Sequence, residues 1–213
     1  MIGEYRAVAC GGVNGKMLYT IHKTDERMDF PGSSHNKRYI YVLLLRYPDT
    51  FSTIFRILTR CKYNHASIGV NDSDGVFYSY VTNGFRKELP QKHPTFKRRE
   101  VPCKLYRVEI SQETYNVTRA ALYDHEQRSH RFKYNILGVI LCLLRFVWPI
   151  KNRYFCSQFV SEVLAQVGAV PLEKHSALYL PDDFTKQKGL DLCFSGYLSQ
   201  LVKGQKPMSL VTA

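Results

Sequence analysis

Apolar positions recur along the chain with two different periods, and they predict a mixture of strands and helices. Residues 38–47 (RYIYVLLLRY) and 65–70 (HASIGV) form short apolar runs, and 103–110 (CKLYRVEI) alternates, as strands do. The segment 76–82 (VFYSYVT) follows the turn residues 71–75 (NDSDG) and predicts the returning strand of a hairpin. Antiparallel hairpins mixed with helices predict an α+β domain.

Helical spacing appears in three segments. One follows Pro48, and a long polar one begins at Ser111 as its cap and runs toward Arg131. The third is YFCSQFVSEVLAQVG (154–168), in which one helical face holds five apolar residues: Phe159, Val160, Val163, Leu164 and Val167. Gly168 suits the left-handed position that follows a helix, so we expect Cys156 in the first turn.

The most apolar stretch is ILGVILCLL (136–144), which is far shorter than the roughly 20 residues of a membrane span. We therefore predict a buried helix beside the functional site. An interfacial helix that contacts lipid is the alternative, because Arg145, Trp148 and Lys151 adjoin the run. Residues 1–38 lack apolar periodicity and predict an irregular extension before a single domain over 39–213.

Charge and cysteine usage limit the classes of partner. The 213-residue chain carries 30 basic and 18 acidic residues, a net charge of +12, which suits an anionic surface or serves solubility. A basic nucleic-acid-binding protein stays an alternative, although no helix-turn-helix, zinc or RNP pattern supports it. The six cysteines are widely spaced without a CxxC pair, so we expect neither a metal nor an organic cofactor. The N-terminus lacks the apolar core of a signal peptide, which predicts a cytoplasmic protein with free thiols.

Cys156 and His65 are the residues on which a catalytic interpretation depends. A helix N-terminus favours an anion, so a thiol in the first turn is favoured as the thiolate, although buried packing is the other common role of cysteine. A thiol nucleophile also needs a base, which is most often histidine. Among seven histidines, His65 stands apart because it begins an apolar strand.

YNHASIGV, followed far downstream by YFCSQFVSEVL, resembles the circularly permuted NlpC-like cysteine hydrolases of the papain-like superfamily. In that group the histidine strand comes first and the cysteine helix last. The similarity extends over about residues 39–201 and includes LLLRYPDTFSTIFRILTR, FYSY and YLPDDF. The resemblance implies a papain-like core in which the cysteine helix packs on a small antiparallel sheet that carries the histidine.

The same resemblance implies that Cys156 is the nucleophile and His65 the general base of a hydrolase or acyltransferase. The third residue of such enzymes is a polar group on the strand after the histidine. Ser79 is our candidate for it, with Tyr80, Thr82, Asn83 and Glu88 as other polar residues of that region. The expected substrate is a peptide-like amide or a lipid ester, with an anionic membrane surface as a further partner. A non-catalytic module that binds a lipid or small molecule on the same fold is the main alternative.

Overall fold

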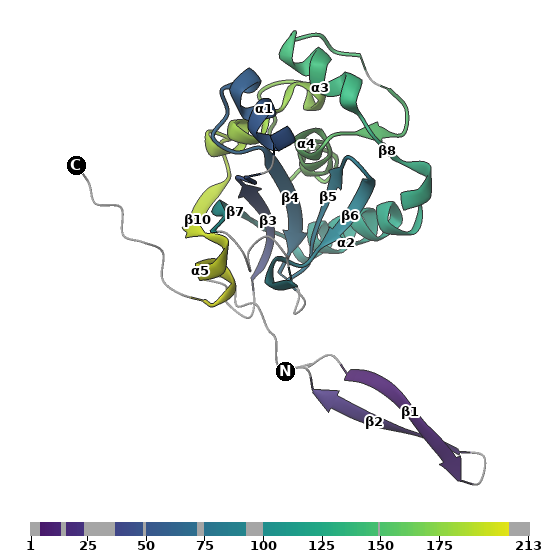
Figure 1. The fold of residues 1–213 in the computed structure, drawn as a ribbon. Helices are drawn as coiled ribbons and strands as arrows, with labels where there is room; N and C mark the ends of the chain where they lie inside the picture. Colours follow the sequence, from purple (N-terminus) through teal and green to yellow (C-terminus); the bar gives the residue numbers. More distant parts are fainter. Residues whose placement is uncertain are drawn as a thin grey trace.

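The computed structural model describes residues 5–13, 16–23, 37–48, 50–71, 75–92, 100–148 and 150–204. Their arrangement is drawn in Figure 1, where strands and helices are interleaved along the chain and confirm the α+β class. The strands are β1 (Tyr5–Val13), β2 (Lys16–Lys23), β3 (Arg38–Leu45), β4 (His65–Val70), β5 (Phe77–Val81), β6 (Gly84–Glu88), β7 (Pro102–Ile110), β8 (Lys133–Tyr134), β9 (Arg153–Tyr154) and β10 (Asp191–Tyr197). The α-helices are α1 (Thr50–Thr59), α2 (Gln112–Gln127), α3 (Ile136–Leu143), α4 (Cys156–Gln166) and α5 (Leu198–Val202). Short 3-10 helices are η1 (Pro90–Lys92), η2 (Ser129–Arg131), η3 (Ser176–Leu178) and η4 (Pro181–Thr185).

Six strands form one sheet in the order β10-β7-β3-β4-β5-β6, and every neighbouring pair is antiparallel. β3 and β4 lie in the middle of the sheet and are buried along almost their whole length. Central strands are covered on both faces, which explains why their sequences read as continuous apolar runs.

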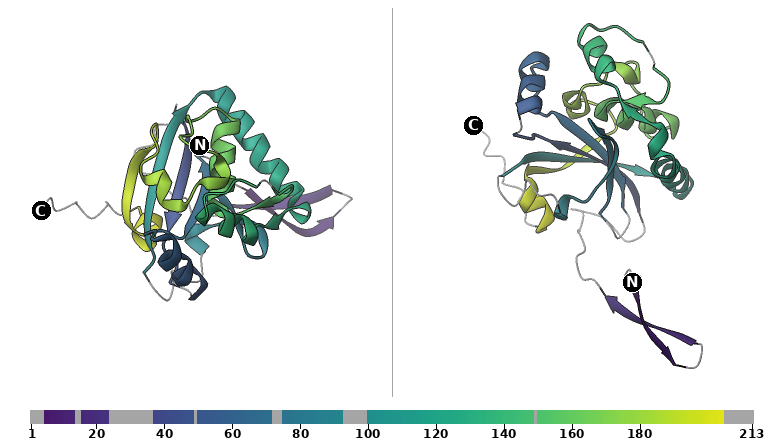
Figure 2. Two further views of the ribbon diagram at one scale, coloured as in Figure 1. Left: turned by 90° about the horizontal axis from the view of Figure 1, so that it is seen from above. Right: turned by 45° about the vertical axis from the view of Figure 1, so that its right-hand side comes forward.

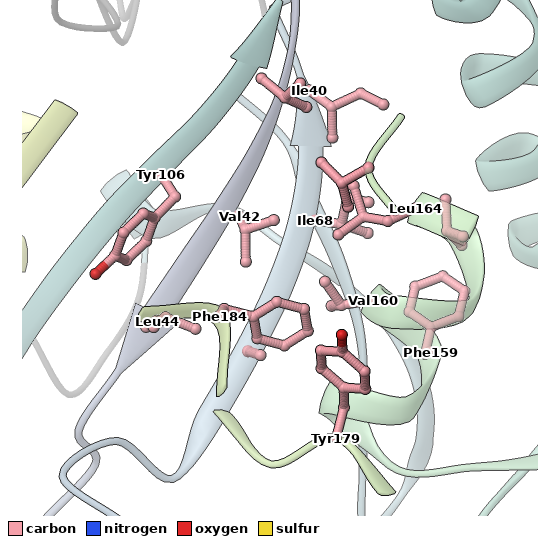
Figure 3. Packing of buried hydrophobic residues seen from close by; sticks show 14 of the residues in the cluster. Ile40, Val42, Leu44, Ile68, Tyr106, Phe159, Val160, Leu164, Tyr179 and Phe184 are labelled. Atoms are coloured by element: carbon pink, nitrogen blue, oxygen red, sulfur yellow. The ribbon is translucent and has the colours of Figure 1, made fainter. Parts of the chain in front are cut away.

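Two apolar clusters cover the two faces of this sheet. On one face α2 and α4 pack over the even-numbered residues of β3 and β4, and Figure 3 shows Val160 and Leu164 of α4 against Ile68. On the other face α5 packs over the odd-numbered residues of β3. Burying an aliphatic or aromatic side chain contributes about 1.5–3 kcal/mol. The four fully buried apolar residues of α4 therefore anchor the start of that helix to the sheet.

α4 has the boundaries that its sequence predicts. It begins at Cys156, and Gly168 has a φ of 64°, the left-handed conformation expected after the last turn. Ser111 caps α2 as expected, because its hydroxyl accepts a hydrogen bond from the amide of Thr114 at 3.1 Å.

The N-terminal segment corrects one expectation. Residues 1–38 were expected to be irregular, yet β1 and β2 pair as an antiparallel hairpin that forms a sheet of its own. Glycines and polar residues within this hairpin dilute the alternating pattern by which a strand is recognised.

Two short parallel strands, β8 and β9, pair at the two ends of the segment that contains α3. The amide of Lys133 in β8 donates to the carbonyl of Asn152, and the amide of Asn135 donates to that of Tyr154 in β9, both at 3.0 Å. The expected helix within this segment is confirmed as α3. No helix in the described ranges is long and apolar enough to cross a membrane.

Candidate active site

His65 is the first residue of β4, and the chain before it is held firmly. The amide group of Asn64 bonds the backbone of Tyr47 in both directions, with each N···O distance at 2.9 Å. This places the Tyr47 ring beside the imidazole, with the ring centroids 5.4 Å apart. His65 is buried, with 5 % of its surface exposed. The imidazole is therefore fixed by its backbone and by a packed ring.

Glu88, the last residue of β6, is the acidic partner of this imidazole. Its Oε1 lies 2.8 Å from Nε2 of His65, and both side chains are almost fully buried. A buried carboxylate is costly unless a charged or hydrogen-bonded partner compensates for the lost water. This contact fixes the orientation of the ring and engages Nε2, so Nδ1 is the ring nitrogen that remains for a second partner.

Cys156 approaches the imidazole from α4. Its side chain lies within hydrogen-bond reach of His65 and is 5 % exposed. Ser157, the next residue, donates its hydroxyl to the carbonyl of Tyr179 at 2.6 Å, which secures the first turn. No side chain caps the start of α4, so amide N–H groups of its first turn remain available next to the sulfur.

The electrostatics of the site favour a charged imidazole. Burial alone would lower the pKa of His65, but the Glu88 carboxylate and the hydrogen-bonded Cys156 sulfur together raise the pKa to about 10. The imidazolium is then the dominant form at neutral pH. A positive charge beside a thiol stabilises the thiolate.

The other described cysteines lie in different surroundings. Burial raises the pKa of Cys61, and it raises the pKa of Cys103 to about 12 and those of Cys142 and Cys193 to about 11. Burial therefore disfavours the thiolate at each of these four, and among the cysteines whose side chains are described only Cys156 has an imidazole partner.

Sequence reasoning missed Tyr134, which lies in β8 next to the cysteine. Burial raises the pKa of its hydroxyl, and negative charge on the nearby Cys156 raises it further. The hydroxyl therefore stays protonated and can act as a hydrogen-bond donor. The sequence offers little signal for it: Tyr134 lies two residues before the apolar run 136–144, and nothing local connects it with Cys156.

The structure brings Cys156 and His65 together but gives Ser79 a different role. The Ser79 hydroxyl donates to the carbonyl of Ala66 at 2.6 Å and so links β5 to β4. Glu88 takes the position beside the imidazole that we expected Ser79 to fill. The expectation considered the strand next to His65, whereas the carboxylate comes from one strand further along the sheet. Glu88 is the only acidic residue between Phe77 and Lys92, and that was the available signal.

The described residues contain no group of three or more His, Cys, Asp or Glu side chains that could hold a metal ion. Comparison with known proteins adds no assignment: no protein-family model matches the chain, and no curated protein sequence is detectably similar to it. What the site can do is therefore argued from its own geometry.

Proposed function

We propose that this protein is a cysteine hydrolase or acyltransferase with a permuted papain-like core, acting on an amide or ester bond. One observation supports it most: β4, β6 and α4 bring an imidazole, a carboxylate and a thiol into one hydrogen-bonded chain. The helix that carries the thiol packs on the antiparallel sheet that carries the other two, with the histidine earlier in the sequence. Nucleophile, base and orienting group are the parts that covalent acyl transfer needs.

The reaction begins with the Cys156 thiolate and the His65 imidazolium. The sulfur attacks the substrate carbonyl carbon, a C–S bond forms, and the carbonyl π electrons move to oxygen. N–H groups at the start of α4 and the Tyr134 hydroxyl stabilise that oxyanion. The carbon–nitrogen or carbon–oxygen bond then breaks, and His65 gives its proton to the departing amine or alcohol.

The second half releases the acyl group. Neutral His65 takes a proton from a water molecule, whose oxygen attacks the thioester and displaces the thiolate as a carboxylic acid forms. An alcohol or amine in place of that water gives acyl transfer instead. Glu88 keeps Nε2 engaged throughout and stabilises the imidazolium whenever it forms.

Thiol labelling of the intact chain tests this proposal. Near pH 6–7, iodoacetamide should label Cys156 first, because an ordinary thiol with a pKa of about 8.5 is mostly protonated there. His65→Ala should slow the labelling, and Cys156→Ser should abolish hydrolysis of an electrophilic acyl probe while the protein still folds. Peptide mass spectrometry reports each cysteine separately.

Cys193 is the matched control, because it is more exposed than Cys156 but has no imidazole partner among the described contacts. Faster labelling of Cys156 cannot then result from access alone. Equal rates at the two cysteines would leave Cys156 as a packing residue and support the non-catalytic binding module.

A further inference from the structure

One helix near the site carries apolar side chains on both of its faces. Towards the protein, Val139 and Cys142 of α3 pack against Phe155, the residue directly before the cysteine. The opposite face and the residues that follow are exposed, and we call them the α3 apolar surface: Ile136, Leu137, Ile140, Leu144, Phe146, Val147 and Trp148. Leu144 is 71 % exposed and Trp148 is 60 % exposed.

These residues are exposed because they lie on one face of the helix, and not because they belong to an unstructured chain end. Ile136, Leu137, Ile140 and Leu144 recur at the spacing of a single helical stripe, whereas the buried residues occupy the other side. A helix that is apolar all round is normally covered all round. A contiguous apolar patch of this kind on a protein surface marks a site that binds another protein, a ligand or a membrane.

Basic residues flank the α3 apolar surface along the sequence. Between Gln127 and Ser161 the sequence has no Asp or Glu, and its basic residues are Arg128, Arg131, Lys133, Arg145, Lys151 and Arg153. Arg145, Lys151 and Arg153 are exposed close to the apolar residues in sequence. An apolar stripe with aromatic residues and flanking cations has the composition of segments that lie in the headgroup region of a membrane.

A second element at the same end of the molecule has similar properties. Figure 1 and the right-hand view of Figure 2 both place α1 at the end of the molecule where α3 lies. Ile57 and Leu58 near the end of α1 are 71 % and 66 % exposed, and the exposed Arg60 and Lys62 follow them. α1 also leads directly into β4, which begins with His65.

We propose that the α3 apolar surface docks on an anionic lipid bilayer. Charge complementarity selects this partner, because the sequence segment that carries this surface, from Gln127 to Ser161, holds cations and no acidic residue. Phe155 connects the inner face of α3 with the first residue of α4, so docking brings the Cys156 site to the level of the lipid headgroups. The substrate is then a lipid-borne amide or ester, an extension that rests on the proposed function.

The only tryptophan of the chain lies within the proposed surface and reports on it directly. Full-length protein is mixed at low salt with vesicles of phosphatidylcholine alone or of equal phosphatidylcholine and phosphatidylglycerol. With the anionic vesicles, Trp148 emission should shift to shorter wavelength and the protein should float with the lipid. High salt should weaken binding at least about tenfold, because it screens exposed charges.

Ile140→Glu is the test variant and Val117→Glu its control, since these side chains are 50 % and 48 % exposed on different helices. Ile140→Glu should lower vesicle affinity at least about tenfold, and Val117→Glu should leave it unchanged. Absence of flotation at low salt, equal binding to neutral vesicles, or equal effects of the two variants would each overturn the proposal. A shift of Trp148 emission that grows with protein concentration without lipid would indicate a second copy of the chain instead.

Labelling of Cys156 by iodoacetamide, without vesicles, separates this inference from the proposed function. Ile140→Glu with normal labelling and lost vesicle binding supports the docking surface on a folded protein. Vesicle binding by wild type without selective labelling of Cys156 would retain the docking surface and remove the enzyme.

Discussion

At the scale of single residues, His65 and Glu88 each make the burial of the other tolerable. Neither charge would be stable alone at 5 % exposure, and their 2.8 Å contact supplies the missing partner. Removing one member takes the charged partner away from the other at a buried position, which is costly. This coupling is what holds the imidazole charged next to the thiol.

Glu88→Gln should separate orientation from charge. The amide keeps the shape of the side chain but no longer stabilises an imidazolium, so selective labelling of Cys156 should fall and probe hydrolysis should drop by about 10²–10⁴-fold. Ser79→Ala is the comparison, because it removes the hydrogen bond to Ala66 and should cost about 1 kcal/mol of stability with labelling unchanged. The reverse result, in which Ser79→Ala alone abolishes labelling, would return the third role to Ser79.

The two members of the dyad were predictable because each begins a strongly patterned element. His65 opens a small apolar strand, and Cys156 falls in the first turn of an amphipathic helix. Glu88 could not be chosen in the same way, since its partner lies two strands away in the sheet. Identifying Glu88 requires the order of strands in the sheet. The hairpin pattern of the sequence predicts only the strand that pairs directly with β4.

At the scale of elements, α3 depends on Asn135, the N-cap residue that precedes it. Asn135 is buried, and its side-chain oxygen accepts a hydrogen bond from the amide of Gly138 at 2.9 Å. A Cβ atom at Gly138 would overlap that same asparagine side chain. Glycine is therefore required at this position by the cap and not by backbone conformation.

Gly138→Ala should destabilise the protein by about 1 kcal/mol, although alanine favours helix by about that amount at an unconstrained site. Urea unfolding measures the change. Asn135→Ala removes the cap, so adding Gly138→Ala to it should cause no further loss. Additive losses in the double variant would show that the clash with the cap is not the cause.

The helical nature of α3 was predictable from its apolar run, but its exposure was not. Every position of Ile136–Leu143 except Gly138 and Cys142 is aliphatic, so the sequence has no polar stripe to mark an outer face. Which face is covered depends on Phe155 and Leu180, and these come from elsewhere in the chain. In α1 the helical spacing of Phe51, Ile54, Phe55 and Leu58 predicts a buried stripe, yet Leu58 is 66 % exposed, which shows the same limit.

At the scale of the whole molecule, the site ties folding stability to pH. The pKa of His65 is near 6.5 in an unfolded chain and is raised to about 10 in the fold. Between pH 6.5 and 10, His65 is therefore protonated in the folded protein and neutral in the unfolded chain. Its contribution to stability is complete below about pH 6.5 and is lost as the pH rises toward 10.

The free energy of unfolding should consequently fall with pH in this window by more in wild type than in His65→Gln. Tyrosines and cysteines away from His65 ionise alike in both proteins and cancel in the difference, whereas Cys156 is coupled to the imidazole and is part of the measured effect. Urea unfolding at several pH values gives the two curves. A difference between them that stays constant from pH 6.5 to 10 would mean that the folded imidazole is not charged.

Because β8 and β9 pair with each other, the segment between them forms an insert that can be replaced as a unit. Its two ends are joined by hydrogen bonds from Lys133 and Asn135, so a substitute of another length would close at small entropic cost. His65 on β4 and Glu88 on β6 lie outside the insert. A graft of a polar loop at 136–151 is expected to remove the proposed membrane docking and leave the pairing of His65 with Glu88 in place.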